Sequence, residues 1–465
     1  MTFTERAKTI LGPGGWLSPA DATGYLADVH GPGGAALLVA RPGSTEALAG
    51  LVALCAAHGV AVIPQGGNTN LCRMAVPTEP REAVVVSLSR MARVVEVNTA
   101  AATMTVEAGC TIAAAQEAAA AHGLVFAPDW GARGTATVGG AVATNGGGLN
   151  VLRYGTTREQ VLGVEVVLPD GRVWNGLRGL IKDNSGYDLK HLFIGSEGTL
   201  GLITRLVFRL HPAQPVSQSI MAVPSDMARL MELFALAREV GGARLTAFEL
   251  MPGIGVEKAL EKYSTLSRPL ETRAEWYLLI RLSDRDSVTD VLADFFERAF
   301  EAGLVSDAVM SGSGAQEANL WALREQMIPI QYFDGAMLKW DVSVPLDRIA
   351  TFLDAALPAV RELADDAIPY AAGHVGDGNI HFAAFLPDDI RLPARRAALY
   401  ERIDRLIWDL GGSIVAEHGV GALFRDRMRG QKDSVEIDLM HRVKSALDPR
   451  GLMNPGKLLA DGEGG

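Results

Sequence analysis

Three glycine-rich segments interrupt this chain between residues 64 and 201 and constrain how that region can fold. They cover residues 64–71, 134–148 and 194–201, and the first directly follows a strand-like stretch. Glycine-rich turns expose backbone N–H groups in a concave surface that suits a phosphate group, and Thr135 or Thr137 can cap a helix that points at the same anion. None matches a Gly-Lys-Ser/Thr phosphate loop or a Gly-x-Gly-x-x-Gly turn after a strand. Each alone could be a plain turn, but three in one region favour phosphate binding.

Helix-like and strand-like stretches alternate around these segments. In the first half we expect strands at 60–63, 83–88, 94–97 and 103–107, and helices at 48–57 and 111–121. From about residue 217 the pattern repeats as strand, helix, strand, with strands expected at 216–223, 243–250 and 276–282 and helices at 227–239 and 288–301. The fold class is therefore predicted to be α+β, with a separate second domain whose antiparallel sheet carries helices on one face.

Size and charge limit the classes of function. The chain has 465 residues, too many for one simple core, so two or three domains are expected. A net charge of −11 argues against a nucleic-acid partner, which needs a basic face. Cys55, Cys72 and Cys110 have no metal or redox spacing, and so few cysteines suit a reducing compartment. No signal peptide is visible at the N-terminus, and the expected location is cytoplasmic.

A short histidine-containing segment, His374-Val-Gly-Asp-Gly-Asn-Ile-His381, predicts a metal site. As a hairpin with its turn at 376–379, it places His374 opposite His381, with Cβ atoms about 5 Å apart. Glu417 could supply a third ligand, with His418 as a base beside it. Three such ligands with a fourth position open are typical of a catalytic metal site. A surface pair of histidines is the alternative that the hairpin alone leaves open.

Taken together, these segments resemble the flavoenzymes of the vanillyl-alcohol oxidase type. They resemble more closely the FAD-linked D-2-hydroxy acid dehydrogenases, and most of all the D-2-hydroxyglutarate branch. The resemblance covers nearly the whole chain and rests on the order of its motifs. These are the 64–71 loop, Asn145-Gly-Gly-Gly148, the 182–190 segment, Gly195-Ser-Glu-Gly-Thr-Leu-Gly201, the two-histidine hairpin, Glu417-His418-Gly419 and Asn454-Pro-Gly-Lys457.

The resemblance implies a two-part FAD-binding domain at 1–212, a substrate or cap domain with the metal site at 213–417, and a C-terminal segment at 418–465 that returns to the FAD domain. Non-covalent FAD is expected because the first loop contains no histidine. By resemblance, the residues that hold the FAD are Pro64, Gly66, Gly67, Asn68, Thr69, Gly134, Thr135, Gly139, Gly140, Asn145, Gly198, Ile203 and Asn454.

The resemblance also assigns the chemistry. Zn²⁺ or a similar divalent ion, held by His374, His381 and Glu417, would orient the 2-hydroxyl and carboxylate of the substrate. His418 would act as the general base, and the C2 hydride would pass to flavin N5. Histidine and carboxylate ligands do not distinguish Zn²⁺ from Mn²⁺ or Co²⁺.

Two cationic residues bear on the substrate. Arg324 and Lys339 look like the carboxylate-binding pair of the D-2-hydroxyglutarate branch, although a solvated arginine on a helix and a lysine at a strand start would explain them without it. Ile328 and Ala383 depart from that branch, which carries Thr or Ser and Asn there. We expect D-2-hydroxyglutarate or D-malate, with D-lactate or a less polar D-2-hydroxy acid as the alternative.

Broader alternatives concern the class of protein. A flavin oxidase of the same fold that acts on another alcohol, and a flavoprotein subunit that mainly binds partners, are both open. Family resemblance implies an electron acceptor other than O₂, such as an electron-transfer flavoprotein or a quinone. The oligomeric state is open, with a homodimer as one alternative.

Overall fold

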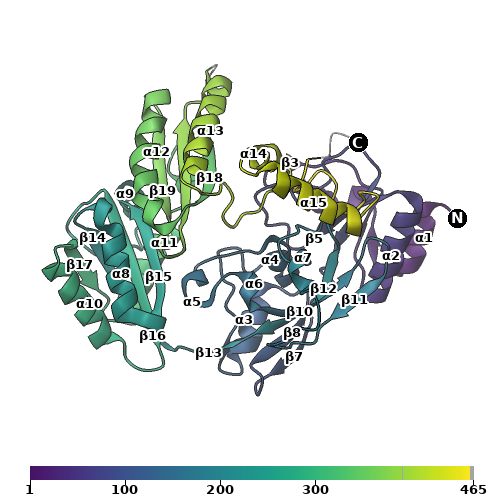
Figure 1. Ribbon diagram of the computed structural model, residues 1–465, viewed down its shortest axis with the longest axis horizontal. Coiled ribbons are helices and arrows are strands. Elements are labelled where there is room, and N and C mark those ends of the chain that lie inside the picture. Colours follow the sequence, from purple (N-terminus) through teal and green to yellow (C-terminus); the bar gives the residue numbers. More distant parts are fainter. Residues whose placement is uncertain (390, 461–465) are drawn as a thin grey trace. The chain divides into compact units, whose positions relative to one another are not determined.

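A computed structural model describes residues 1–389 and 391–460 and divides the chain into two compact units (Figure 1). The first unit contains residues 1–148, 154–213 and those from Glu417 onward, and the second contains Leu149–Arg153 and Gln214–Ala416.

Leu149–Arg153 lie within the range predicted for the first domain, and Glu417 within that predicted for the second, but each belongs to the other unit. Arg153 Nη1 donates to the carbonyl of Ser283 in the second unit, at 2.8 Å. Glu417 Oε2 accepts from the backbone N–H of Gly148 in the first unit, at 2.7 Å. The hydrogen bonds of the Arg153 and Glu417 side chains therefore assign these residues to their units. Sequence periodicity does not reveal such bonds.

The first unit contains two main sheets. One has the order β1 (Trp16–Leu17), β4 (Leu38–Ala40), β6 (Ala83–Ser87), β5 (Ala61–Gln65), with β4, β6 and β5 parallel. The other is antiparallel, with the order β11 (Val173–Gly176), β10 (Val161–Val167), β12 (Leu202–Arg209), β8 (Thr103–Glu107), β7 (Val94–Asn98). Two-stranded pairs are β2 (Ala27–Asp28) with β3 (Gly31–Pro32), and β9 (Leu124–Val125) with β13 (His211–Pro212).

Helices cover these sheets and bury one large apolar core. They are α1 (Phe3–Leu11), α2 (Thr45–His58), α3 (Ile112–Ala120), α4 (Val138–Thr144), α6 (Thr157–Gln160), α7 (Lys190–Phe193), α14 (Arg425–Arg429) and α15 (Ser434–Leu447). Helix α2 begins where Ser44 Oγ accepts from the N–H of Ala47, and it ends at Gly59, whose φ of 74° favours glycine. Val84, Val106 and Val164 from three different strands are fully buried in the shared core.

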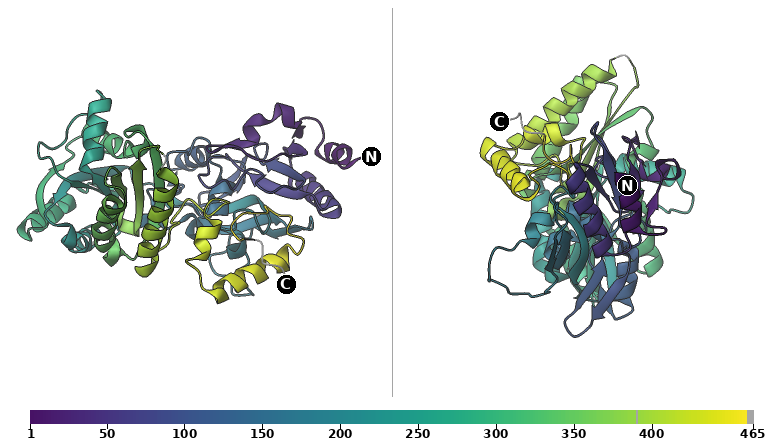
Figure 2. Two further views of the ribbon diagram at one scale, coloured as in Figure 1. Left: turned by 90° about the horizontal axis from the view of Figure 1, so that it is seen from above. Right: turned by 90° about the vertical axis from the view of Figure 1, so that its right-hand side faces the viewer.

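The end of the described chain returns to the first unit. The backbone N–H of Val62 donates to the carbonyl of Leu452 at 2.8 Å, and the N–H of Asn454 donates to the carbonyl of Val62 at 2.8 Å. Residues 452–454 thus run beside β5, and Figure 2 shows this yellow segment against the first unit. The return places Asn454 against β5 and against Met74, which follows the first glycine-rich loop in the chain.

The second unit is built on a seven-stranded antiparallel sheet. Its order is β17 (Val305–Met310), β14 (Val216–Pro224), β16 (Trp276–Asp284), β15 (Leu245–Pro252), β19 (Ile368–His374), β20 (Asn379–Leu386), β18 (Ala336–Ser343). Its helices are α5 (Val151–Tyr154, whose last residue falls in the first unit), α8 (Leu230–Gly241), α9 (Gly253–Lys262), α10 (Thr289–Glu301), α11 (Gly314–Glu325), α12 (Ile349–Leu363) and α13 (Leu392–Asp409).

Helices cover both faces of this sheet, so the expectation of helices on one face was wrong. Ile220 and Ala222 of β14 are buried with α8, α10, α12 and α13. Met221 and Val223, which alternate with them, are buried with α9 and α11. Successive side chains of a strand point to opposite faces, and both sets are apolar, so both faces need a cover.

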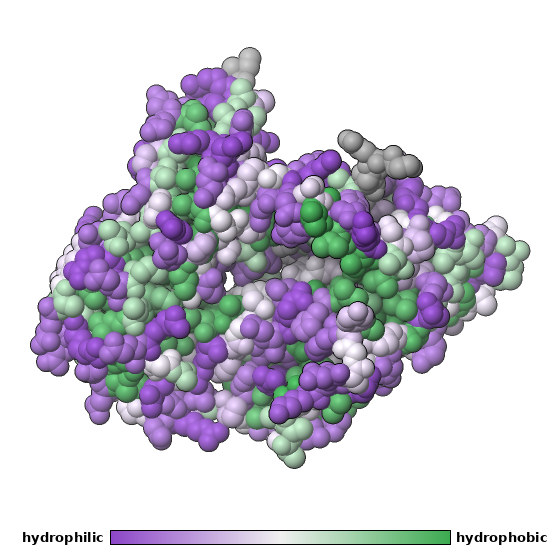
Figure 3. Space-filling view, in the orientation of Figure 1, coloured by the Kyte–Doolittle hydropathy of each residue, from purple (hydrophilic) through white to green (hydrophobic). Residues whose placement is uncertain are grey.

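The outer surface of the second unit is polar where its long helices face solvent. Figure 3 shows hydrophilic residues gathered over α12 and α13, and Arg396, Glu401, Arg402 and Arg405 of α13 are exposed. Within residues 1–389 and 391–460, no helix has both the length and the apolar character needed to cross a membrane.

Candidate functional site

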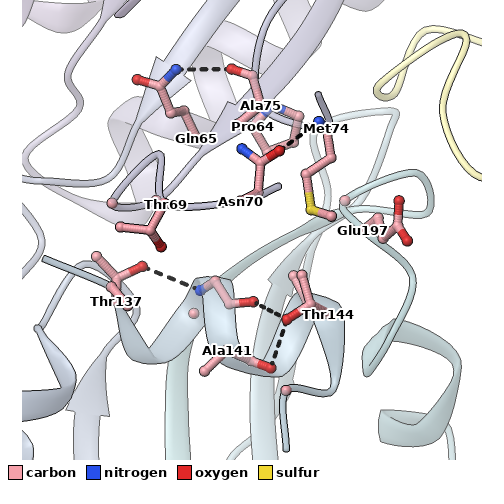
Figure 4. A pocket seen from close by; sticks show the side chains of 18 of the residues that line it. Pro64, Gln65, Thr69, Asn70, Met74, Ala75, Thr137, Ala141, Thr144 and Glu197 are labelled. Carbon is pink, nitrogen blue, oxygen red and sulfur yellow. Dashed lines mark hydrogen bonds between the residues drawn. The ribbon is translucent and has the colours of Figure 1, made fainter. Parts of the chain in front are cut away.

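A cavity of about 390 Å³ lies in the first unit, among all three glycine-rich segments (Figure 4). This size falls within the range of small-molecule sites. Among the residues assigned to FAD by resemblance, those that line it are Pro64, Gly66, Gly67, Asn68, Thr69, Gly139, Gly140, Gly198 and Ile203. Glu417 and His418 line the same cavity.

Close backbone packing explains why glycine occupies several of these positions. A Cβ atom on Gly67 would lie 2.0 Å from the carbonyl oxygen of Thr135, and one on Gly66 would lie 2.4 Å from Thr137 Oγ1. Gly198 has a φ of 70°, and its Cβ would lie 2.7 Å from Pro64 Cγ. The first loop therefore packs directly on the second and third segments, and no side chain fits between them.

Threonine 137 caps the helix at the cavity wall. Thr137 Oγ1 accepts from the N–H of Gly140 at 3.2 Å, and α4 begins at Val138. Of the two caps that the sequence left open, Thr137 fills the role, because it directly precedes the first helical residue. At the other end of α4, the Thr144 hydroxyl donates to the carbonyl of Gly140 (Figure 4).

Four of the residues assigned to FAD do not line this cavity. Gly134 and Thr135 are exposed on the loop before α4. Asn145 ends α4 with a φ of 52°, and its Oδ1 accepts from the N–H of Arg158 at 2.8 Å. Asn454 is buried, and its Nδ2 donates to the carbonyls of Met74 (3.0 Å) and Glu197 (2.7 Å). Asn454 thus joins the C-terminal segment to two loops that line the cavity.

Polar atoms around the cavity fit a ligand that bears hydrogen-bonding groups. Asn68 Oδ1, Asn70 Nδ2 and Asn454 Oδ1 are buried, and none has a hydrogen-bond partner within the described residues. Leaving a buried polar atom unpaired costs about 1–3 kcal/mol. Asn68 and Asn70 belong to the glycine-rich loop of the cavity. The loop therefore suits a cofactor that supplies both donors and acceptors.

Glu197 was not identified from the sequence, yet it holds the segment that carries His418. Its Oε1 accepts from the N–H of Val420 at 2.7 Å, and its Oε2 accepts from the N–H of Gly421 at 2.8 Å. Burial raises the pKa of Glu197, and the two N–H donors oppose that shift. The sequence signal for these two hydrogen bonds was a single acidic residue between glycines, in Gly195-Ser-Glu-Gly198.

The two-histidine hairpin of the second unit has a different register from the expected one. His374 lies opposite Asn379, and His381 lies opposite Ala372, so His374 does not face His381 directly. The turn starts earlier than expected, at 375–377, and closes at Gly378 with a φ of 86°. His381 is two residues from Asn379, so the histidines still share a face, and their ring centroids lie 5.4 Å apart.

Arg324 forms a buried ion pair on this face of the sheet. Its Nε and Nη2 donate to Glu249 Oε2 at 2.9 and 2.7 Å, and His374 Nδ1 lies 2.9 Å from Glu249 Oε1. Burial raises the pKa of Glu249, but the charges and hydrogen bonds of His374 and Arg324 outweigh it and lower the pKa to about 2. Glu249 was missed because it lies within the otherwise apolar stretch of β15.

Lys339 lies in the middle of β18 rather than at a strand start, opposite Ala383. Asp341, two residues on, shares its face and lies opposite His381. The Asp341 carboxylate lies 3.5 Å from His381 Nδ1 and accepts from Asn379 Nδ2 at 2.9 Å. The second unit thus places two histidines, two carboxylates and two cations on one face.

Comparisons with known proteins assign the chain to a family. Residues 213–458 match the family described as FAD linked oxidases, C-terminal domain, and residues 36–176 match the FAD binding domain. The chain belongs to the FAD-linked oxidases. FAD is therefore its cofactor, as the resemblance implied.

Relatives with assigned activities narrow the class of enzyme. A D-2-hydroxyglutarate dehydrogenase of Xanthomonas citri pv. viticola is 37% identical over 428 residues, which cover 91% of this chain and 89% of that protein. One of Stutzerimonas stutzeri is 34% identical over 472 residues, covering 98% of each. The mitochondrial enzyme of Danio rerio is 35% identical over 435 residues, covering 92% and 79%. This FAD-linked oxidase is an FAD-dependent 2-hydroxy acid dehydrogenase.

Solved structures confirm the predicted fold class. The p-cresol methylhydroxylase structure has a TM-score of 0.79 at 17% identity, covering 100% of this chain and 97% of that one. An alkyldihydroxyacetonephosphate synthase structure has a TM-score of 0.74 at 19% identity, covering 97% and 85%. Both likenesses concern the fold alone.

Gly67→Ala is expected to lower FAD affinity by roughly tenfold or more, about 1.4 kcal/mol. The added Cβ cannot fit 2.0 Å from the carbonyl of Thr135, so the loop must move away from the second segment. The measurement is the ratio of flavin to protein absorbance after purification and dilution. Gly24→Ala is the matched control, because a Cβ there meets nothing within 4 Å. Wild-type FAD retention in Gly67→Ala would show that this loop does not hold the cofactor.

Proposed function

We propose that this FAD-dependent dehydrogenase oxidises D-2-hydroxyglutarate to its 2-oxo acid, with D-malate as a shorter substrate. The observation that carries the proposal is the pair of cations on one face of the second unit. Arg324 lies against His374, and Lys339 is two residues from Asp341, which lies opposite His381. A dicarboxylate needs two such contacts, one from a forked guanidinium and one from an ammonium group. The names of the relatives support the same substrate.

The guanidinium of Arg324 has one nitrogen, Nη1, that could bind a substrate carboxylate. Its Nε and Nη2 are bonded to Glu249, while Nη1 has no hydrogen bond within the described residues. At Ala383, directly opposite Lys339, a methyl group stands where the D-2-hydroxyglutarate branch carries Asn. The charge of Lys339 would therefore hold the distal carboxylate without help from an amide.

A divalent ion, Zn²⁺ or similar, is proposed to bind His374, His381 and Glu417. Imidazole and carboxylate donors suit such an ion. The two histidines share one face of the second unit, with ring centroids 5.4 Å apart, which supports their part in the proposal. When bound, the ion would act as a Lewis acid toward the substrate hydroxyl.

His418 is proposed as the general base, because it lines the FAD cavity and Glu197 fixes the backbone after it. One imidazole nitrogen would take the hydroxyl proton as the C2 hydride leaves. FAD is proposed to be non-covalent, since residues 64–71 contain no histidine. An electron-transfer flavoprotein or a quinone is proposed as the acceptor by family resemblance.

An anaerobic titration of the flavin band tests the substrate. D-2-hydroxyglutarate is expected to bleach it at the lowest concentration and D-malate at a higher one, while the L-enantiomers leave it oxidised. Lys339→Met should weaken the response to the two dicarboxylates and leave that to D-lactate unchanged. Equal bleaching by D-lactate or by apolar D-2-hydroxy acids would move the assignment to the less polar alternative, which Ile328 and Ala383 favour. No bleaching by any 2-hydroxy acid would overturn the proposed function.

A further inference from the structure

Four ionisable side chains form a row across neighbouring strands of the second unit. Glu249 of β15 lies opposite His374 of β19, and Asp341 of β18 lies opposite His381 of β20. Directly opposed residues put their side chains on one face, and the two histidines are diagonal neighbours on β19 and β20. Each hairpin histidine therefore has its own buried carboxylate beside it.

Glu249 engages His374 at its Nδ1. The distance from Nδ1 to the carboxylate is 2.9 Å, and both side chains are buried. Arg324 pairs with Oε2 of the same carboxylate, which compensates the buried negative charge. Arg324 Nη2 also lies 3.4 and 3.5 Å from the two ring nitrogens of His374.

Asp341 is the acidic neighbour of His381, at a longer distance than that between Glu249 and His374. Its Oδ1 lies 3.5 Å from His381 Nδ1. Asn379 Nδ2 donates to Oδ1 at 2.9 Å, and the N–H of Ala416 donates to Oδ2 at 3.1 Å. These two donors hold the carboxylate in place beside the imidazole, and the side chain is buried.

We propose that Glu249 and Asp341 are positioning residues that orient His374 and His381 as metal ligands. An imidazole whose Nδ1–H donates to a carboxylate keeps its lone pair on Nε2, and that nitrogen becomes the ligand atom. The carboxylate also makes the imidazole a better donor to the metal. The inference rests on the divalent ion of the proposed function, and it assigns Nε2 of both histidines to that ion.

The test is the affinity of the FAD-bound, full-length protein for Zn²⁺ after removal of its metal with a chelator. Glu249→Gln and Asp341→Asn are each expected to weaken Zn²⁺ binding about 10–100-fold, measured by competition with a chromophoric chelator. Glu257→Gln is the control, because Glu257 also pairs with an arginine of this unit, Arg268, without contact to a histidine.

Separate readouts distinguish the outcomes. Flavin content and the denaturation midpoint are measured on every variant, and Asp341→Asn leaves the Arg324 ion pair intact if Glu249→Gln folds poorly. A variant with wild-type midpoint and flavin content but weaker Zn²⁺ binding supports the inference. If both variants fold and both bind Zn²⁺ with wild-type affinity, the inference is overturned. If Glu249→Gln does not fold, wild-type affinity in Asp341→Asn alone overturns it. A wild-type protein that binds no Zn²⁺ would instead remove the metal from the proposed function.

Discussion

His381→Ala is expected to lose the bound metal and to slow flavin reduction by D-2-hydroxyglutarate about 10³-fold or more, while FAD stays bound. A Lewis acid at the substrate hydroxyl stabilises the transition state by several kcal/mol, and each 1.4 kcal/mol is about tenfold in rate. The His381 side chain is 34% exposed, so its truncation leaves the core intact. Elemental analysis, flavin absorbance and anaerobic stopped-flow reduction measure the three properties separately.

Two further histidine variants distinguish the loss of a metal ligand from the loss of a base. His418→Ala should keep both metal and FAD and still slow reduction by a factor on the order of 10²–10⁴, because it removes a base and not a ligand. His122→Ala, at an exposed helix end, should match the wild type in every property. A metal-free His381→Ala enzyme with full activity would refute the metal assignment.

Local sterics made the glycine-rich part of the site predictable from sequence. The segments around Gly67 and Gly139 pack closely on the backbone of Thr135 and Ala108, and Gly198 packs on the ring of Pro64, so glycine is required at these positions. The strands expected at 83–88 and 103–107 also match β6 and β8. In the second unit, the nearly continuous apolar run of β16 already signals a sheet covered on both faces, which the one-face expectation overlooked.

The register of the hairpin and the partners of its histidines were not predictable in the same way. The turn between His374 and His381 depends on the positive φ of Gly378, and a shift of one residue changes every opposed pair. Glu249 is 125 residues from His374 in the chain. No local pattern connects two residues so far apart, and only the strand order of the sheet brings them together.

Arg324→Ala is expected to destabilise the second unit by about 3–5 kcal/mol as well as to raise the KM for D-2-hydroxyglutarate. Removal of the guanidinium leaves the carboxylate of Glu249, which is 2% exposed, without its arginine counter-charge, and an uncompensated buried charge costs about that much. Denaturant unfolding followed by tryptophan fluorescence measures the stability, because Trp276, Trp321 and Trp340 all lie in this unit.

A double variant and a comparison with the more exposed ion pair Arg268–Glu257 test why Arg324→Ala loses stability. Replacing both partners, with Glu249→Gln and Arg324→Met, should recover much of the stability, because no buried charge is then left unpaired. Arg268→Ala removes a similar two-pronged arginine from Glu257, but that carboxylate is 28% exposed, so a loss of only about 1 kcal/mol or less is expected. If Arg324→Ala were as stable as Arg268→Ala and kept the wild-type KM, Arg324 would be neither a core ion-pair partner nor a substrate contact. A stable variant with a raised KM would instead show that Arg324 acts on substrate alone, and that water or metal compensates Glu249.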